Sequence, residues 1–289
     1  MKGVLLAGGN GTRLSPLTDA VCKQLLPVFD KPMIYYPIST LIYAGVDQLL
    51  IICKKDDHIS FKKLLGVGDQ FGISIQYKIQ DAPKGLAHGL LLAADFVGAD
   101  NFWFILGDNL FDGPDFGIKL NDSYLPKNGS KIFVYSVSDP ENYGVANFHS
   151  SGYLESVEEK PLKAKSKWAI PGVYFFDKSA FGRASTIKPS SRGEIEMIDL
   201  LKSYLGEKLL FVEKIKRGNI WFDLGSPSSL LKGANYVKKI QARNGELIGS
   251  PEFVANKMNI DVQKRYNTLN KNKNSSYYSA LNRLFNVSD

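Results

Sequence analysis

The residues best suited to chemistry lie near the beginning of the chain, where an apolar run leads into a glycine-rich turn. Residues 4–13 read Val-Leu-Leu-Ala-Gly-Gly-Asn-Gly-Thr-Arg, and Lys23 follows ten positions after Arg13. Glycines at positions 8, 9 and 11 carry no Cβ and permit φ > 0, so successive backbone N–H groups can converge on one anion. Arg13 and Lys23 add positive charge. The pattern predicts a phosphate-binding turn.

Two other kinds of glycine-rich phosphate motif do not fit this turn. The dinucleotide-binding motif Gly-x-Gly-x-x-Gly fails because Leu14 stands where its last glycine belongs. The Walker motif fails because no Gly-Lys-Ser or Gly-Lys-Thr follows. A nicotinamide oxidoreductase is therefore disfavoured. The turn still offers backbone N–H donors and Arg13. The planar guanidinium of an arginine binds phosphate oxygens bidentately.

The charge balance favours anionic partners. The 289 residues include 36 lysines and arginines against 29 aspartates and glutamates, a formal net charge of +7. The basic residues are dispersed, and the densest group, Lys257 to Lys273, lacks the interleaved aromatic residues of a single-strand binder. We therefore predict phosphorylated small molecules as partners and no nucleic acid.

Several other kinds of site are disfavoured by composition. No apolar run approaches the ~20 residues that a membrane span needs, and the chain opens directly on a strand pattern, so we predict a cytoplasmic protein without membrane contact. The two cysteines, Cys22 and Cys53, are too few for a disulfide framework. The three histidines lie far apart, which argues against a zinc site.

The order of apolar runs predicts an α/β fold with a largely parallel sheet in the first half and antiparallel strands after residue 130. We expect strands at 2–6, 48–53, 73–78, 102–106, 131–137, 144–148, 153–158, 168–176 and 209–215. We expect helices near 33–44, 57–65, 85–96, 114–122, 193–205, 228–243, 251–258 and 278–285, with Gly206 as a helix cap. This order suggests a core over 1–225, with halves at about 1–130 and 131–225, and a helical carboxyl-terminal region over 226–289.

Seven further blocks support one family assignment. They are Lys23-Gln24-Leu25-Leu26-Pro27-Val28 with Asp30-Lys31-Pro32-Met33-Ile34-Tyr35-Tyr36-Pro37, Leu106-Gly107-Asp108-Asn109, Tyr143-Gly144-Val145, Glu158-Glu159-Lys160-Pro161, Gly172-Val173-Tyr174, Arg192-Gly193-Glu194 and Trp221-Phe222-Asp223-Leu224-Gly225. With the opening turn they span nearly the whole chain. The chain thus resembles the sugar nucleotidyltransferases, most closely the glucose-1-phosphate thymidylyltransferases. The resemblance implies a Rossmann-like three-layer fold with a mixed, mostly parallel sheet and an appended helical layer, and a homotetramer.

Two aspartates are candidates for a magnesium site. Asp108 follows the apolar run 102–106, at the carboxyl end of a strand, where open α/β sheets bind ligands. Asp223 lies at a second junction of strand and turn. Two carboxylates with triphosphate oxygens make a plausible Mg²⁺ shell, and the resemblance supports this interpretation over a turn-capping role.

The resemblance also implies a role for each matching residue. Arg13, Lys23, Asp108 and Asp223 would be catalytic. The nucleotide would contact Leu6, Gly8, Gly9, Gly11, Thr12, Arg13, Lys23, Gln24, Gln80, Gly85 and Asp108, with base contacts from Gln24, Gln80 and Gly85. The sugar phosphate would contact Asn109, Tyr143, Gly144, Glu159, Lys160, Ile170 and Arg192.

The implied reaction converts dTTP and glucose 1-phosphate to dTDP-glucose and pyrophosphate by in-line attack of the sugar phosphate on the α-phosphorus. The same chemistry with UTP or a modified sugar 1-phosphate stays open. A non-catalytic nucleotide-binding module of this fold is the other alternative, although all four catalytic candidates are present.

Some positions depart from the family pattern. His88 stands where glutamine is usual, beside the base-binding turn, and Pro171 replaces a threonine beside the sugar pocket. Base and sugar preference are therefore open. Residues 111–114, Ser250 and Lys257 depart from the family at positions that resemble its feedback site. We expect weakened or altered inhibition by the downstream sugar nucleotide, dTDP-rhamnose.

Overall fold

The computed structural model describes residues 1–81, 84–114, 116, 117, 120, 125–190, 193–263 and 275–285. Its strands are β1 (Lys2–Ala7), β2 (Pro27–Val28), β3 (Lys31–Pro32), β4 (Gln48–Cys53), β5 (Ser74–Ile79), β6 (Phe102–Leu106), β7 (Asn109–Asp112), β8 (Ser130–Ser136), β9 (Gly144–Phe148), β10 (Leu154–Glu159), β11 (Trp168–Ala169), β12 (Val173–Phe176), β13 (Leu210–Lys214) and β14 (Ile220–Asp223). Its α-helices are α1 (Tyr35–Tyr43), α2 (Lys55–Leu65), α3 (Leu86–Leu91), α4 (Ala94–Val97), α6 (Ser179–Thr186), α7 (Met197–Gly206), α8 (Pro227–Asn244), α9 (Pro251–Lys257) and α11 (Ser276–Leu284).

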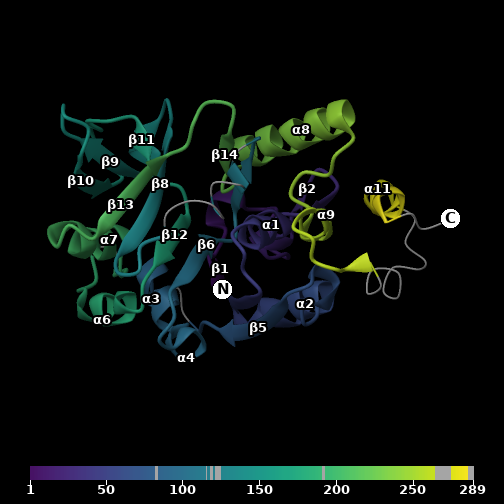
Figure 1. The fold of residues 1–289 in the computed structure, drawn as a ribbon, viewed down its shortest axis with the longest axis horizontal. Coiled ribbons are helices and arrows are strands. Elements are labelled where there is room, and N and C mark those ends of the chain that lie inside the picture. The colour runs from purple at the N-terminus through teal and green to yellow at the C-terminus, as the bar shows by residue number, and fades with distance from the viewer. Residues whose placement is uncertain are drawn as a thin grey trace.

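A mixed sheet organises the molecule (Figure 1). Within the described residues it has ten strands in the order β10-β9-β11-β8-β12-β6-β1-β4-β5, with β13 paired to β8. The strands β5, β4, β1 and β6 run parallel, as the alternation of apolar runs and helices predicted. Beyond β6, β12 and β8 join in antiparallel register. The predicted α/β class with a mixed sheet is confirmed.

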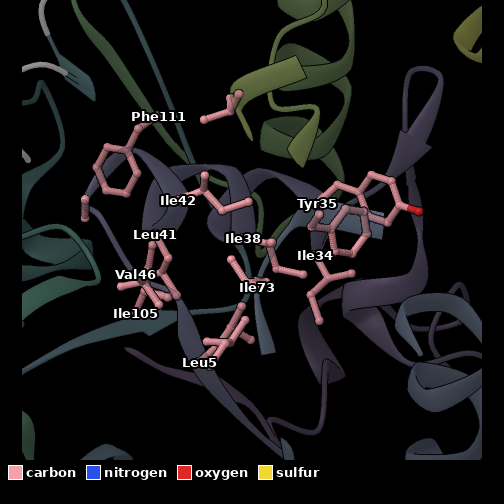
Figure 2. Packing of buried hydrophobic residues seen from close by; sticks show 14 of the residues in the cluster. Leu5, Ile34, Tyr35, Ile38, Leu41, Ile42, Val46, Ile73, Ile105 and Phe111 are labelled. Atoms are coloured by element: carbon pink, nitrogen blue, oxygen red, sulfur yellow. The ribbon is translucent and has the colours of Figure 1, made fainter. Parts of the chain in front are cut away.

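Two apolar layers cover the faces of this sheet. Successive residues of a strand point to opposite faces, and β1 follows this rule, because Leu5 packs in one core cluster and Leu6 in the other. The helices α1, α2, α9 and α11 contribute to the first cluster. The helices α3, α4, α6 and α7 contribute to the second. Figure 2 shows Ile38 and Leu41 of α1 lying beside Leu5 and Ile105 of the sheet.

The carboxyl-terminal helices pack against elements from both ends of the preceding core. α8 contacts β2 and β14 and adds Val237 to a third apolar cluster with Val28 and Leu224 (Figure 1). α9 packs on α1, and α11 packs on α9. Among the described residues, no helix combines the length and apolarity that crossing a bilayer requires.

Several predicted elements have different bounds. The strand predicted over 168–176 is divided into β11 and β12 by Pro171, which has no backbone N–H for a ladder. The helix predicted over 85–96 is two short helices, α3 and α4. The helix predicted from 193 begins at Met197. Gly206 is its last helical residue rather than its cap, and the left-handed residue that follows is Lys208, with φ 61°. Most of the helix predicted near 114–122 lies outside the described residues.

Candidate active site

The carboxyl ends of the parallel strands bring the predicted nucleotide-side residues to one edge of the sheet. β1 ends at Ala7 and leads into the glycine turn, β5 ends just before Gln80, and β6 ends two residues before Asp108. Because these strands are parallel neighbours, their carboxyl ends share an edge. The backbone N–H of Gly107 donates to the carbonyl of Leu6 at 2.9 Å, which holds the turns after β1 and β6 together.

The three glycines of the opening turn serve different purposes. Of the three, Gly11 has φ in the left-handed region, at 65°, whereas Gly8 and Gly9 do not use the conformational freedom that glycine permits. Gly8 permits a close approach, since a Cβ there would lie 2.3 Å from Oε1 of Gln80. Gly9 has no neighbouring atom within 4 Å of such a Cβ and borders open space. The turn therefore keeps free room above Gly9 for a ligand.

A short pair of strands that the sequence analysis did not predict brings the two aspartates together. β7 and β14 pair antiparallel, with Asn109 opposite Asp223. The backbone N–H of Leu224 also donates to the carbonyl of Asp108 at 2.9 Å. Residues more than a hundred positions apart in the chain thus become neighbours, and both carboxyls face the same cleft.

Lys23 forms a largely buried ion pair with Asp108. The ammonium contacts Oδ2 of Asp108, and the two side chains are only 10% and 14% exposed. Burial opposes ionisation of Asp108, but the Lys23 charge and hydrogen bonds from Lys23 and Asn109 outweigh it, so the pKa of Asp108 lies below its usual range. This carboxylate is therefore ionised across the physiological pH range.

The surroundings of Asp223 raise the pKa of its carboxyl, whereas those of Asp108 lower it. Burial, followed by the negative charge of Asp108, raises the pKa of Asp223 to about 6, against weaker opposing effects of Lys23 and Arg13. Nη2 of Arg13 lies 3.7 Å from Oδ2 of Asp223, and the Arg13 side chain is 62% exposed. Two carboxylates that repel each other in this way are suited to share a cation. Among the described residues, no three acidic, cysteine or histidine side chains converge on a metal position.

Replacing Asp223 with asparagine should stabilise the ligand-free protein at pH 8. In the folded state Asp223 titrates near pH 6, above its unfolded value, so its contribution favours folding below about pH 4 and is lost as the pH rises through 6. Asparagine keeps an oxygen for the N–H of Gly225, which donates to Oδ1 of Asp223 at 3.0 Å. We expect a gain of about 1–3 kcal/mol at pH 8 that shrinks toward pH 5. Thermal unfolding without Mg²⁺ at both pH values measures it, and an equal offset at both would contradict the assignment.

The sugar-side candidates line a cleft of about 280 Å³ that reaches the two aspartates. Of the predicted residues, the lining includes Arg13, Asp108, Asn109, Tyr143, Gly144, Glu159, Lys160, Ile170 and Asp223. The ring of Tyr143 packs edge-on against Trp221 with centroids 5.0 Å apart. Lys160 follows β10 with φ 39°, a conformation unusual for a lysine, and its ammonium lies 4.0 Å from Oε1 of Glu159. The cleft thus presents an ammonium, a guanidinium and carboxylates side by side.

Asn109 is engaged within the protein. Its Nδ2 donates to Oδ1 of Asp108 at 3.0 Å, and its Oδ1 accepts from the N–H of Gly172 at 3.1 Å and from Nε1 of Trp221 at 2.6 Å. Asn109 is only 2% exposed. We therefore expect it to orient Asp108 rather than to grip the sugar phosphate on its own.

The cleft also contains residues that were not predicted as site residues. They are Leu86, Leu106, Asn142, Gly172, Tyr174, Glu194, Glu196, Met197, Ile198 and Trp221. Five of them belong to sequence blocks that carried the family resemblance, so a signal was available for Leu106, Gly172, Tyr174, Glu194 and Trp221. Glu196 sits just before α7 and had no such signal.

Other predicted nucleotide contacts lie outside the cleft lining. Gln24 and Gln80 are 3% and 4% exposed and pack beside Gly107 and Gly8. Gly85 has φ 99° and lies against the backbone of Ile195. A Cβ added to Gly85 would lie 2.5 Å from the carbonyl oxygen of Ile195. Arg192, predicted for the sugar phosphate from the start of a helix, lies outside the described residues, and α7 begins five residues after it.

A second cavity of about 350 Å³ contains several residues at the positions that resemble a feedback site. Its lining includes Asp112, Gly113, Pro114 and Lys257. Ser250 is fully buried and caps α9. Its hydroxyl forms a hydrogen bond with the hydroxyl of Tyr277 at 2.8 Å. Weakened or altered inhibition by dTDP-rhamnose through this cavity stays a prediction.

Comparison with known proteins identifies the family of this chain. The family model described as Nucleotidyl transferase matches residues 2–240. A glucose-1-phosphate thymidylyltransferase of Neisseria meningitidis is 46% identical over 241 residues, which cover 83% of this chain and 84% of the relative. One of Mycolicibacterium smegmatis is 45% identical over 255 residues, covering 88% of each.

Solved structures share the fold. A Bacillus anthracis protein described as a glucose-1-phosphate thymidylyltransferase, in complex with sucrose, is 38% identical with a TM-score of 0.76, covering 82% of this chain and 94% of its own. A UDP-glucose pyrophosphorylase complexed with UDP-glucose, 24% identical with a TM-score of 0.72 over 83% of this chain and 98% of its own, shows the same fold. The predicted resemblance is confirmed: the chain belongs to the nucleotidyl transferase family, among relatives named glucose-1-phosphate thymidylyltransferase.

Proposed function

We propose that this enzyme transfers the thymidylyl group of dTTP to glucose 1-phosphate in a Mg²⁺-dependent reaction that releases pyrophosphate. The observation that carries the proposal is the group of Lys23, Asp108 and Asp223 at the sheet edge, between an open glycine turn and a cleft that contains Lys160. The names of the curated relatives support the nucleotide and the sugar.

The two carboxylates fit a magnesium ion whose remaining ligands come from the nucleotide. Asp108 stays ionised beside Lys23, and the raised pKa of Asp223 reflects burial first and then repulsion by Asp108, which a cation would relieve. Hard carboxylate oxygens are the ligands that Mg²⁺ prefers, and it commonly binds through one or two of them with substrate phosphates. Once bound, the ion would neutralise charge on the phosphates.

The protein's own residues align two anions and stabilise charge. The backbone of the glycine turn and Arg13 would hold the triphosphate, while Lys160 would hold the sugar phosphate. A phosphate oxygen of the sugar attacks the α-phosphorus, a new P–O bond forms, and the bond to the oxygen bridging the α- and β-phosphorus breaks in line, so that pyrophosphate leaves with that oxygen. Lys23 would stabilise charge on the transferring group. This route needs no covalent intermediate with the protein.

A panel of pyrophosphate-release assays tests the proposal. Each of dTTP, UTP, CTP, ATP and GTP is combined with glucose 1-phosphate and other sugar 1-phosphates, with Mg²⁺ or with excess EDTA. We expect release with dTTP and glucose 1-phosphate that EDTA abolishes. Highest kcat/KM with UTP or another sugar would favour that alternative, and no release with any pair would favour the non-catalytic nucleotide-binding module.

A further inference from the structure

The side chain of Asn109 joins three separate segments of the chain beside the cleft. Its Oδ1 accepts from the N–H of Gly172, just before β12, at 3.1 Å and from Nε1 of Trp221, on β14, at 2.6 Å. Its Nδ2 donates to Oδ1 of Asp108 at 3.0 Å. Because Asn109 is 2% exposed, its amide serves these neighbours rather than solvent.

The neighbours of Asn109 settle the orientation of its amide. The N–H of Gly172 and the indole N–H of Trp221 can only donate, so the atom that both reach must be the carbonyl oxygen. The NH₂ group then faces Asp108, whose carboxylate can only accept. A turned amide would place its oxygen against that carboxylate and its NH₂ against two donors, at the cost of all these hydrogen bonds. The arrangement therefore keeps a donor on Oδ1 of Asp108.

Both oxygens of Asp108 are consequently held by donors. Oδ1 accepts from Asn109, and Oδ2 contacts the ammonium of Lys23. Burial opposes ionisation, but the charge of Lys23 and the hydrogen bonds from Lys23 and Asn109 lower the pKa of this carboxyl. Asn109 thus fixes the direction of the carboxylate and also favours its charged form.

Trp221 is well placed to act on this carboxylate through Asn109. It is 8% exposed, and its ring packs against Tyr143 and Tyr135 with centroids 5.0 and 6.0 Å apart. The one polar atom of its side chain donates to Asn109. Trp221 and Asp223 lie two residues apart on β14 and so share a face of this strand. One short strand therefore supplies Asp223 and also helps to hold the other carboxyl of the pair.

We propose that Trp221 is a positioning residue for Asp108, which it orients through the amide of Asn109. Without the indole N–H, the buried Oδ1 of Asn109 loses one of its two donors, and the amide is less firmly held against Asp108. A misdirected carboxylate lowers the rate, because groups that act on developing charge must be held in place before the reaction. The inference rests on the proposed role of Asp108 in nucleotidyl transfer.

Two substitutions separate the hydrogen bond of Trp221 from its bulk. Trp221→Phe keeps an aromatic ring but has no donor. Trp221→His lacks the six-membered ring but offers Nε2–H at the corresponding position of its five-membered ring, and at pH 8 its imidazole is mostly neutral. We expect Trp221→Phe to lower kcat for pyrophosphate release about tenfold, with KM for glucose 1-phosphate within about twofold of wild type. Trp221→His should keep kcat within about threefold of wild type.

A double-mutant cycle tests whether Trp221 acts through Asn109. Asn109→Ala removes the link, so adding Trp221→Phe to it should lower kcat by less than about twofold further. Asn109→Asp leaves the indole unaltered and keeps Oδ1 for its two donors, but it replaces the donor to Asp108 with an oxygen. Its kcat should fall at least as far as that of Trp221→Phe.

Trp103→Phe is the matched control. Trp103 is fully buried on β6, and its Nε1 has no hydrogen-bond partner within the part of the chain that the structure describes. The variant therefore makes the same chemical change without breaking a hydrogen bond, and it should retain the kcat of wild type. Cooperative thermal unfolding of each variant establishes that folded proteins are compared.

Several outcomes would overturn the inference. They are an unchanged kcat in Trp221→Phe, equal losses in Trp221→Phe and Trp221→His, and the same loss from Trp221→Phe with and without Asn109. An effect confined to KM for glucose 1-phosphate would also overturn it, because a residue that only forms a wall of the sugar cleft produces that result. All of these leave the proposed function intact, whereas wild-type protein that releases no pyrophosphate would overturn the proposed function itself.

Discussion

Lys23→Ala should lower kcat for pyrophosphate release by about 10²–10³-fold while leaving the protein folded. The Lys23 ammonium forms an ion pair with Asp108, and the lysine side chain is 10% exposed. Its removal leaves two neighbouring carboxylates without that compensating charge and takes a cation from the proposed position of the transferring phosphoryl group. Steady-state kinetics with dTTP and glucose 1-phosphate measures the loss.

Lys2 provides the matched control for this variant. Its side chain is 22% exposed and forms an ion pair with Asp100 at 2.9 Å, at the amino end of β1 and away from the cleft. Lys2→Ala removes the same atoms from a comparable environment and should keep near-normal turnover. Near-normal pyrophosphate release by Lys23→Ala would remove Lys23 from the mechanism.

Asp108→Asn should lower turnover by about 10²-fold or more and weaken the dependence on Mg²⁺ concentration. Asparagine keeps an oxygen for the hydrogen bond from Asn109, which donates to Oδ1 at 3.0 Å, so the loop should retain its shape. What disappears is the charge that pairs with Lys23 and that we propose as a magnesium ligand. Titration of activity against Mg²⁺ separates a loss of ion affinity from a loss of kcat.

The double variant Lys23→Ala with Asp108→Asn sharpens this prediction. Because the two side chains act as one pair, their effects should be strongly non-additive, and the double variant should lose about as much as the more impaired single variant. Asp100→Asn is the control for the change of charge. Unaltered turnover and Mg²⁺ dependence in Asp108→Asn would exclude this carboxylate from the ion site.

Local patterns were sufficient to predict the parallel half of the sheet. β1, β4, β5 and β6 are five- or six-residue elements, and β1, β4 and β6 are almost entirely buried, so continuous apolar runs marked them. The glycine turn after β1 was predicted from spacing alone. The strand over 168–176 was predicted too long because the apolar run continues through Pro171, where the ladder cannot.

The pairing of β7 with β14 could not be predicted from local pattern. Both strands have four residues, and the register that joins Asn109 to Asp223 depends on chain segments more than a hundred positions apart. The raised pKa of Asp223 follows from this pairing, as does the enclosure of Asn109 by Trp221 and Gly172. The family resemblance named the residues, whereas their mutual arrangement required the tertiary structure.

The most direct test of nucleotidyl transfer follows the oxygen atoms. Wild-type enzyme is given Mg²⁺, dTTP and glucose 1-phosphate in which the three non-bridging phosphate oxygens are ¹⁸O, and the products are analysed by mass spectrometry. Attack by the sugar phosphate on the α-phosphorus predicts dTDP-glucose that retains all three labels and pyrophosphate that contains none. Labelled inorganic phosphate or labelled pyrophosphate, or dTMP in place of dTDP-glucose, would contradict the account.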